Sequence, residues 1–195
     1  LAEALGATVV QRHPSGLVRV AGDFGVLRWD GMGWHLEPRV TTWIDAVGAG
    51  DGDDRKVIAM LLAFAVHDLG SRGIGATLVY RAGSDGRGSH QSPMPAPPPM
   101  RITRPVDLAP LRHVLAQLDG AALFDAEGCL VEVGVRLVPS SEAESGVAGF
   151  RGMRHTSARR YSADDPLATV IVVSEDGPVT VLRAGRRVGE SAPIA

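Results

Sequence analysis

Three short clusters between Leu118 and Gly177 decide how the fold of this chain is interpreted. They read Leu118-Asp119-Gly120-Ala121, Gly152-Met153-Arg154-His155-Thr156-Ser157-Ala158 and Val173-Ser174-Glu175-Asp176-Gly177. Each cluster lies where an apolar run meets a turn or the start of a helix. Junctions of this kind expose the backbone and the side chains that bind ligands in α/β proteins. We therefore expect the chemistry of the chain to reside in these clusters.

The segments around the clusters alternate between helical and strand patterns. Apolar residues recur at three- and four-residue spacing over 55–69 and 108–118, which predicts two amphipathic helices. A third helix is expected over 154–161. Strands are predicted for the apolar runs 76–80, 121–125, 129–137, 168–174 and 179–182. This order predicts an α/β fold with a mixed β-sheet flanked by helices.

Two regions depart from this pattern. Residues 1–50 contain short strand-like runs separated by glycines, which predicts a small β-rich N-terminal region before a main domain over 54–190. The tryptophans of the first region, Trp29, Trp34 and Trp43, are typical of core or domain-interface positions. Residues 81–100 are rich in Gly and Pro and cannot bury enough apolar surface to offset their ordering entropy. An exposed loop is therefore predicted inside the main domain.

Composition narrows the classes of function. The chain has 195 residues and a formal net charge of −2, which argues against the dense basic surface of a duplex nucleic-acid binder. Its single cysteine, Cys129, cannot form an internal disulfide or a cysteine metal cluster. The sequence has no secretory signal pattern and no apolar run long enough to span a membrane. A cytoplasmic protein without a membrane segment is expected.

Asp119 is the first candidate for chemistry. It is followed by Gly120 and Ala121, whose minimal side chains let a ligand approach the backbone closely, so its carboxylate suits a metal-bound hydroxyl group. A capping or turn aspartate is the plainer interpretation of this tripeptide. Arg154 and His155 are the second candidates, because a guanidinium, an imidazole and free amide groups at a helix start suit a phosphate.

The third cluster adds polar groups at the end of a predicted buried strand. Ser174, Glu175 and Asp176 supply a hydroxyl and two carboxylates at the carboxyl edge of the sheet, where α/β proteins usually bind ligands. An acidic β-turn is the plainer interpretation of this cluster. The three clusters in this order are much more specific together than any of them alone.

Together, the clusters resemble the diadenylate cyclase (DAC) domain family, which includes the catalytic domain of the DNA integrity scanning protein DisA. The resemblance is strongest over 111–183. It implies a nucleotidyltransferase in which two domains hold two ATP molecules face to face. Each 3′-hydroxyl group attacks the α-phosphate of the other ATP, with Mg²⁺ or Mn²⁺, and the products are pyrophosphate and cyclic di-AMP, a second messenger in bacterial signalling. The implied partners are ATP and a second copy of the domain.

The resemblance also implies a role for each matching residue. Asp119 is implied to bind metal and to help deprotonate the 3′-hydroxyl group, and Asp176 is implied as a further metal ligand. Arg154 and His155 correspond to the phosphate-binding pair. The remaining residues of the implied nucleotide site are Gly120, Ala121, Leu137, Val138, Thr156, Ser157, Ser174 and Glu175.

The second cluster departs from the family pattern, which is commonly Gly-Thr-Arg-His-Arg-Ala-Ala. Met153 removes a hydroxyl group and Thr156 removes a cation. One charge-assisted hydrogen bond contributes about 1.5 to 3 kcal/mol, so its loss predicts slower catalysis unless Thr156, Ser157, Arg159 or Arg160 compensates. Two hypotheses follow. One is an active diadenylate cyclase, and the other is a DAC-like nucleotide-binding sensor domain that is weakly active or inactive.

Overall fold

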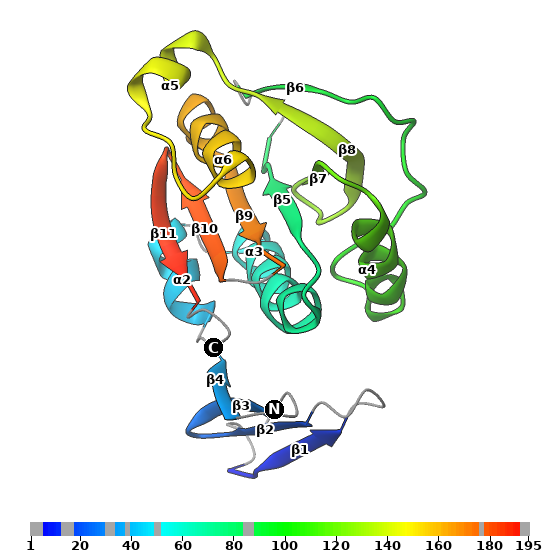
Figure 1. Cartoon of the computed structure of the whole chain (residues 1–195). Coiled ribbons are helices and arrows are strands. Elements are labelled where there is room, and N and C mark those ends of the chain that lie inside the picture. The colour runs from blue at the N-terminus through cyan, green and yellow to red at the C-terminus, as the bar shows by residue number, and fades with distance from the viewer. Residues whose placement is uncertain are drawn as a thin grey trace. The chain divides into compact units, whose positions relative to one another are not determined.

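The computed structural model describes residues 6–12, 18–29, 34–37, 40–48, 52–83, 88–175 and 178–191. The chain forms two compact units, one ending at Arg39 and the other beginning at Val40 (Figure 1). The predicted β-rich region extended to residue 50. Its last part instead contains helix α2 (Val40–Val47), which belongs to the larger unit, because α2 packs against the core of that unit through Trp43 and Ile44.

The smaller unit is a four-stranded antiparallel sheet. Its strands lie in the order β1 (Val9–Arg12), β2 (Val18–Gly22), β3 (Gly25–Trp29) and β4 (Trp34–Glu37). The small β-rich N-terminal region that the sequence predicts is therefore confirmed as an antiparallel sheet. Trp29 and Trp34 are paired with their ring centroids 5.7 Å apart. Trp34 is 53% exposed and so is not a core residue, whereas Trp43 is 7% exposed.

The larger unit is built on a seven-stranded mixed sheet, as predicted. The strands follow the order β11-β10-β9-β5-β7-β8-β6. Their bounds are β5 (Ala76–Tyr80), β6 (Ser89–Gln91), β7 (Ala121–Phe124), β8 (Leu130–Val138), β9 (Thr169–Val173), β10 (Val179–Arg183) and β11 (Arg186–Glu190). Strands β5 and β7 run parallel, and the other described pairs of this sheet are antiparallel.

Helices cover both faces of this sheet. They are α2, α3 (Asp53–Phe64), α4 (Leu108–Gln117), α5 (Ser141–Gly146) and α6 (Met153–Asp164). Helix α3 continues as a π-helical turn, Ala65–Leu69, and a 3₁₀ turn, Gly70–Arg72, so the predicted helix over 55–69 is confirmed with a change of helical type. The predicted helices over 108–118 and 154–161 correspond to α4 and α6.

Alternating side chains of the central strands form two separate cores. On β9, Ile171 and Val173 belong to the core shared with α2, α3 and α4, whereas Val170 and Val172 belong to the core shared with α6. Figure 1 shows α6 on one face of the sheet and α3 on the other. All five residues of β9 are buried, as expected for a strand covered on both faces.

Two segments differ from their predicted structure. The Gly/Pro-rich segment over 81–100 contains strand β6, in which Ser89 pairs with Val138 of β8, so it is not wholly an exposed loop. The segment also packs inward at Gly88, because a Cβ atom there would lie 2.5 Å from the ring of the buried Tyr161. Helix α5 lies between the predicted strand over 129–137 and the predicted helix over 154–161, where no helix was predicted. Its start is stabilised by Ser140, whose side chain accepts a hydrogen bond from the Ala143 amide at 3.1 Å.

The burial of β9 on both faces of the sheet leads to a prediction about the stability of the larger unit. Ile171→Ala should lower the free energy of unfolding by about 2 to 5 kcal/mol, because Ile171 is fully buried in the middle of β9. Leu167→Ala is the control, since Leu167 is 66% exposed and should cost less than about 0.5 kcal/mol. Urea denaturation of both variants measures the difference. Equal stabilities would show that β9 is not the centre of the core.

Candidate functional site

The three clusters meet at one edge of the larger sheet. Strands β5 and β7 begin at this edge, and β9, antiparallel to β5, ends there, with Ala76 opposite Val173. Helix α6 also begins at this edge. A cavity of about 500 Å³ is lined by Asp119, Arg154 and Glu175, one residue from each cluster. Residues far apart in the sequence are thus brought to a single site by strand pairing.

Asp119 and Arg154 form an exposed ion pair. Arg154 Nη2 lies 3.4 Å from Asp119 Oδ1, which also accepts a hydrogen bond from the Gly120 amide at 2.9 Å. The Asp119 side chain is 95% exposed, and that of Arg154 is 36% exposed. Exposed ion pairs contribute about 0 to 1 kcal/mol. Either partner is therefore available to a ligand that offers a stronger contact.

Gly75 makes room for two of the site's side chains. A Cβ atom at this position would lie 2.5 Å from Arg154 Nη1 and 3.0 Å from Glu175 Oε1. Both side chains therefore cross directly over the backbone at the start of β5. This glycine lies between the helix predicted over 55–69 and the strand predicted over 76–80. Sequence reasoning missed its role because the contact is formed by the tertiary fold.

Gly120 and Ala121 position Asp119 and do not line the cavity. Gly120 has φ +98°, and a Cβ atom there would lie 2.7 Å from the backbone carbon of Gly134 in β8. Ala121 is 3% exposed and belongs to the core beneath α6. The two small residues let β7 start directly against β8. As a result the Asp119 carboxylate is held at the edge of the sheet.

His155 is packed behind the site and does not line the cavity. It is 7% exposed, and its Nε2 atom lies 3.4 Å from Thr180 Oγ1 on β10. Its ring lies nearly perpendicular to the ring of Phe150, with an interplanar angle of 77° and a centroid distance of 5.7 Å. Burial lowers the pKa of His155, and the charges of Arg151 and Arg154 lower it further. The imidazole is therefore neutral near neutral pH.

The hydroxyl groups after His155 stabilise the first turns of α6. Thr156 Oγ1 accepts a hydrogen bond from the Phe150 amide at 3.0 Å and lies 3.2 Å from the Phe150 carbonyl oxygen. Ser157 Oγ donates to the Arg154 carbonyl oxygen at 3.1 Å. The guanidinium groups of Arg159 and Arg160 contact the carbonyl oxygens of Gly185 and Val147. Among the described contacts, none of these four side chains replaces the missing family cation at the cavity.

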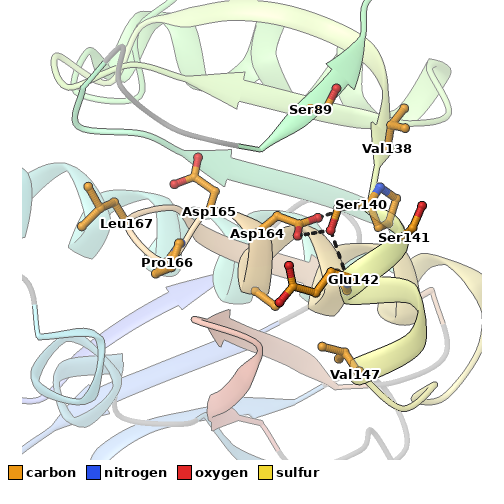
Figure 2. A pocket seen from close by; sticks show the side chains of 14 residues that line it. Ser89, Val138, Ser140, Ser141, Glu142, Val147, Asp164, Asp165, Pro166 and Leu167 are labelled. Carbon is orange, nitrogen blue, oxygen red and sulfur yellow. Dashed lines mark hydrogen bonds between the residues drawn. The ribbon is translucent and has the colours of Figure 1, made fainter.

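Leu137 and Val138 lie away from the cavity that Asp119 lines. Leu137 is 9% exposed and packs in the core beneath α6. Val138 lines a second cavity, of about 980 Å³, whose wall includes the C-terminal end of α6 (Figure 2). Here Asp164 accepts hydrogen bonds from the Ser140 amide at 2.7 Å and from the Ser140 hydroxyl at 2.6 Å. These bonds tie α5 to α6, as Figure 2 shows.

The third cluster supplies one described carboxylate to the site. Glu175 lines the cavity, Ser174 is half-buried at the end of β9, and Asp176 lies outside the described residues. Within the described ranges, no group of three or more His, Cys, Asp or Glu residues could hold a metal ion. Asp119 and Glu175 are the described carboxylates that line the cavity. Proteins usually bind Mg²⁺ through one or two carboxylates together with substrate phosphates.

A helix that crosses a membrane needs about 20 predominantly apolar residues. In the portion of the chain that the structure describes, no helix has both the length and the apolar character needed to cross a membrane.

Comparisons with known proteins identify the family to which most of the larger unit's sequence is similar. A family model described as "DAC: DisA bacterial checkpoint controller nucleotide-binding" matches residues 63–187. No curated protein shows significant similarity to the chain. A solved structure of a hypothetical membrane spanning protein from Bacillus cereus is 19% identical with a TM-score of 0.49, covering 72% of this chain and 70% of that chain. Since the family match covers more than half of the sequence and all three clusters, the chain belongs to the DAC family of DisA-type nucleotide-binding domains.

Proposed function

We propose that this chain is a diadenylate cyclase that condenses two ATP molecules into cyclic di-AMP and releases pyrophosphate. The observation that carries the proposal is the convergence of Asp119, Arg154 and Glu175 on one cavity of about 500 Å³. That volume lies within the usual range for a small-molecule site, roughly 300 to 1,000 Å³. Membership of the DAC family supports a nucleotide as the ligand.

Arg154 is the residue proposed to bind the ATP phosphates. Its bond to Asp119 is exposed and contributes at most about 1 kcal/mol. A charge-assisted bond to a phosphate contributes about 1.5 to 3 kcal/mol. A phosphate therefore replaces the carboxylate as the partner of Arg154. The exchange leaves Asp119 free for a second role.

Asp119 is the residue proposed to accept the proton of the 3′-hydroxyl group. In the reaction, the 3′-oxygen of one ATP bonds to the α-phosphorus of the other, the bond from that phosphorus to the β-phosphate bridging oxygen breaks, and pyrophosphate leaves. The hydroxyl proton needs an acceptor near the attacking oxygen. Because its side chain is 95% exposed, Asp119 can reach a nucleotide held by a facing copy of the domain.

A divalent cation completes the proposed site. Asp119, Glu175 and Asp176 are the residues proposed to hold Mg²⁺ or Mn²⁺, and Glu175 lines the same cavity as Asp119. When bound, the cation neutralises charge on the phosphates and so favours nucleophilic attack at phosphorus. The side chains supply the orientation, since phosphoryl transfer depends more on positioning and charge than on covalent help from the protein.

A nucleotide-binding sensor domain without cyclase activity is the second candidate. It is favoured by one observation, that Arg154 is the one cation among the described residues lining the cavity. Incubation with ATP and Mn²⁺, followed by chromatography for cyclic di-AMP, distinguishes the two candidates when combined with calorimetric measurement of ATP binding. Product formation supports the cyclase. ATP binding without product supports the sensor, and the absence of both refutes the nucleotide site.

Removing the charge of Asp119 tests its proposed role. Asp119→Asn should reduce cyclic di-AMP formation by about 100-fold or more, because the amide cannot accept the hydroxyl proton. The free energy of unfolding should change by less than about 1 kcal/mol, since only an exposed ion pair is lost. Glu127→Gln, on the exposed turn between β7 and β8, is the charge-matched control. An unchanged rate in Asp119→Asn would refute the assignment.

Removing the guanidinium of Arg154 tests the phosphate contact. Arg154→Ala should weaken ATP binding by about 10- to 100-fold, which corresponds to one charge-assisted hydrogen bond. Arg160→Ala is the matched control on the same helix, because its guanidinium contacts the Val147 carbonyl oxygen and not the cavity. Calorimetric titration with ATP measures both variants. Equal affinities would mean that Arg154 does not bind the phosphates.

Gly75→Ala tests the geometry of the cavity without changing its charge. The new methyl group would lie 2.5 Å from Arg154 Nη1 and 2.9 Å from Glu175 Cγ, so both side chains must move. We expect ATP affinity to fall by about tenfold, equivalent to about 1.4 kcal/mol. Gly146→Ala is the control, because a Cβ atom there meets nothing within 4 Å. Wild-type affinity in Gly75→Ala would show that the arrangement over Gly75 is not the one that binds ATP.

A further inference from the structure

A chain of polar contacts connects His155 to the outermost strand of the sheet. Thr180 Oγ1 lies 3.4 Å from His155 Nε2 and 3.5 Å from Glu190 Oε1. Thr180 on β10 and Glu190 on β11 are directly opposite each other in the antiparallel register. Thr180 is fully buried and His155 is 7% exposed. The contact between the imidazole and the carboxylate therefore passes through one buried hydroxyl group.

Glu190 is itself held in place by two arginines. Arg151 Nη1 lies 2.5 Å from Oε1, and Arg187 Nη1 lies 2.6 Å from Oε2. Both guanidinium groups also lie over the ring of Phe150, at 5.2 and 5.7 Å from its centroid. Arg151 has φ +56°, an uncommon conformation for a residue with a side chain. Glu190 thus fixes the segment that precedes α6 as well as the hydroxyl group behind His155.

The direction in which the Thr180 hydroxyl donates its single proton determines which nitrogen of the His155 imidazole is protonated. An ionised carboxylate can only accept hydrogen bonds, so a bond between Thr180 and Glu190 uses the hydroxyl proton. The lone pairs of Oγ1 are then available to His155, which must donate from Nε2. In a neutral imidazole the other nitrogen, Nδ1, then carries no proton.

The geometry points to Glu190 as a positioning residue that acts through Thr180 to hold His155 as the neutral tautomer protonated on Nε2. With Nδ1 as an acceptor, His155 cannot donate a hydrogen bond to a phosphate, so Arg154 binds the phosphates without it. The assignment of phosphate binding to Arg154 alone rests on the proposed cyclase function. The tautomer of His155 is inferred from the hydrogen-bond geometry and does not depend on that function. The groups that face the ring are Arg151, Arg154 and Glu190.

The protonation of the His155 imidazole depends on pH, and the surrounding charges determine the direction in which its pKa is shifted. Burial and the two arginines lower the pKa of His155 below 6.5, whereas Glu190 raises it. Both ring nitrogens become donors only when the pH falls below this lowered pKa. Removing the charge of Glu190 should lower the pKa further. His155 then stays neutral to a more acidic pH in the variant than in the wild-type protein.

Nuclear magnetic resonance of ¹⁵N-histidine-labelled full chain tests the inference directly. The chain has six histidines, and the His155 signals are assigned by their loss in His155→Gln. In the wild-type protein at neutral pH we expect the Nε2-protonated tautomer. In Glu190→Ala, which removes the acceptor of the Thr180 proton, and in Thr180→Val, which removes the hydroxyl group, this preference should be lost, with an increase in the form protonated on Nδ1. Thr180→Ser, which keeps the hydroxyl group, should restore it.

Controls separate positioning from a general loss of structure. Glu144→Ala, which removes an exposed carboxylate on α5, should leave the His155 tautomer unchanged. A wild-type ring protonated on Nδ1, or an unchanged tautomer in Glu190→Ala, would overturn the role of Glu190. Absence of cyclisation with the expected tautomers would instead count against the proposed function alone.

Discussion

The pairing of β5 with β7 on one side and β9 on the other is the constraint on which the rest of the larger unit depends. The parallel pair places the starts of β5 and β7 together, and the antiparallel neighbour places the end of β9 beside them. Arg154 and Asp119 are 35 residues apart in sequence, yet they meet here. Burial of these three strands on both faces fixes their register, since a slip of one residue would exchange the two cores.

Close backbone approach is the second requirement of the site. Gly120 lets the start of β7 contact β8, and Gly75 lets two charged side chains cross β5. Neither position tolerates a Cβ atom without movement of its neighbours. The polar site is therefore shaped as much by missing side chains as by the carboxylates and the guanidinium that line it.

The sequence predicted the central strands, three helices and the residues Asp119, Arg154 and Glu175, because apolar periodicity and junction positions depend on local order. It did not predict α5, whose six residues depend on the cap at Ser140. It also placed Val138 with the nucleotide site, whereas the structure places it at the other cavity. His155 was expected beside Arg154, but successive residues of a helix point about 100° apart. Arg154 therefore lines the cavity, while His155 packs against β10.

The charges around the smaller cavity have a consequence for how a nucleotide reaches it. Among the described lining residues, Asp119 and Glu175 carry two negative charges and Arg154 carries one positive charge. The net negative charge of these residues repels a polyphosphate anion at long range. The repulsion weakens when the charge of the polyphosphate is reduced. A nucleotide that carries its own divalent cation meets a lower barrier. The rate of nucleotide association would then depend on the concentration of the cation–nucleotide complex. Ionic conditions would therefore affect binding before the nucleotide contacts the site.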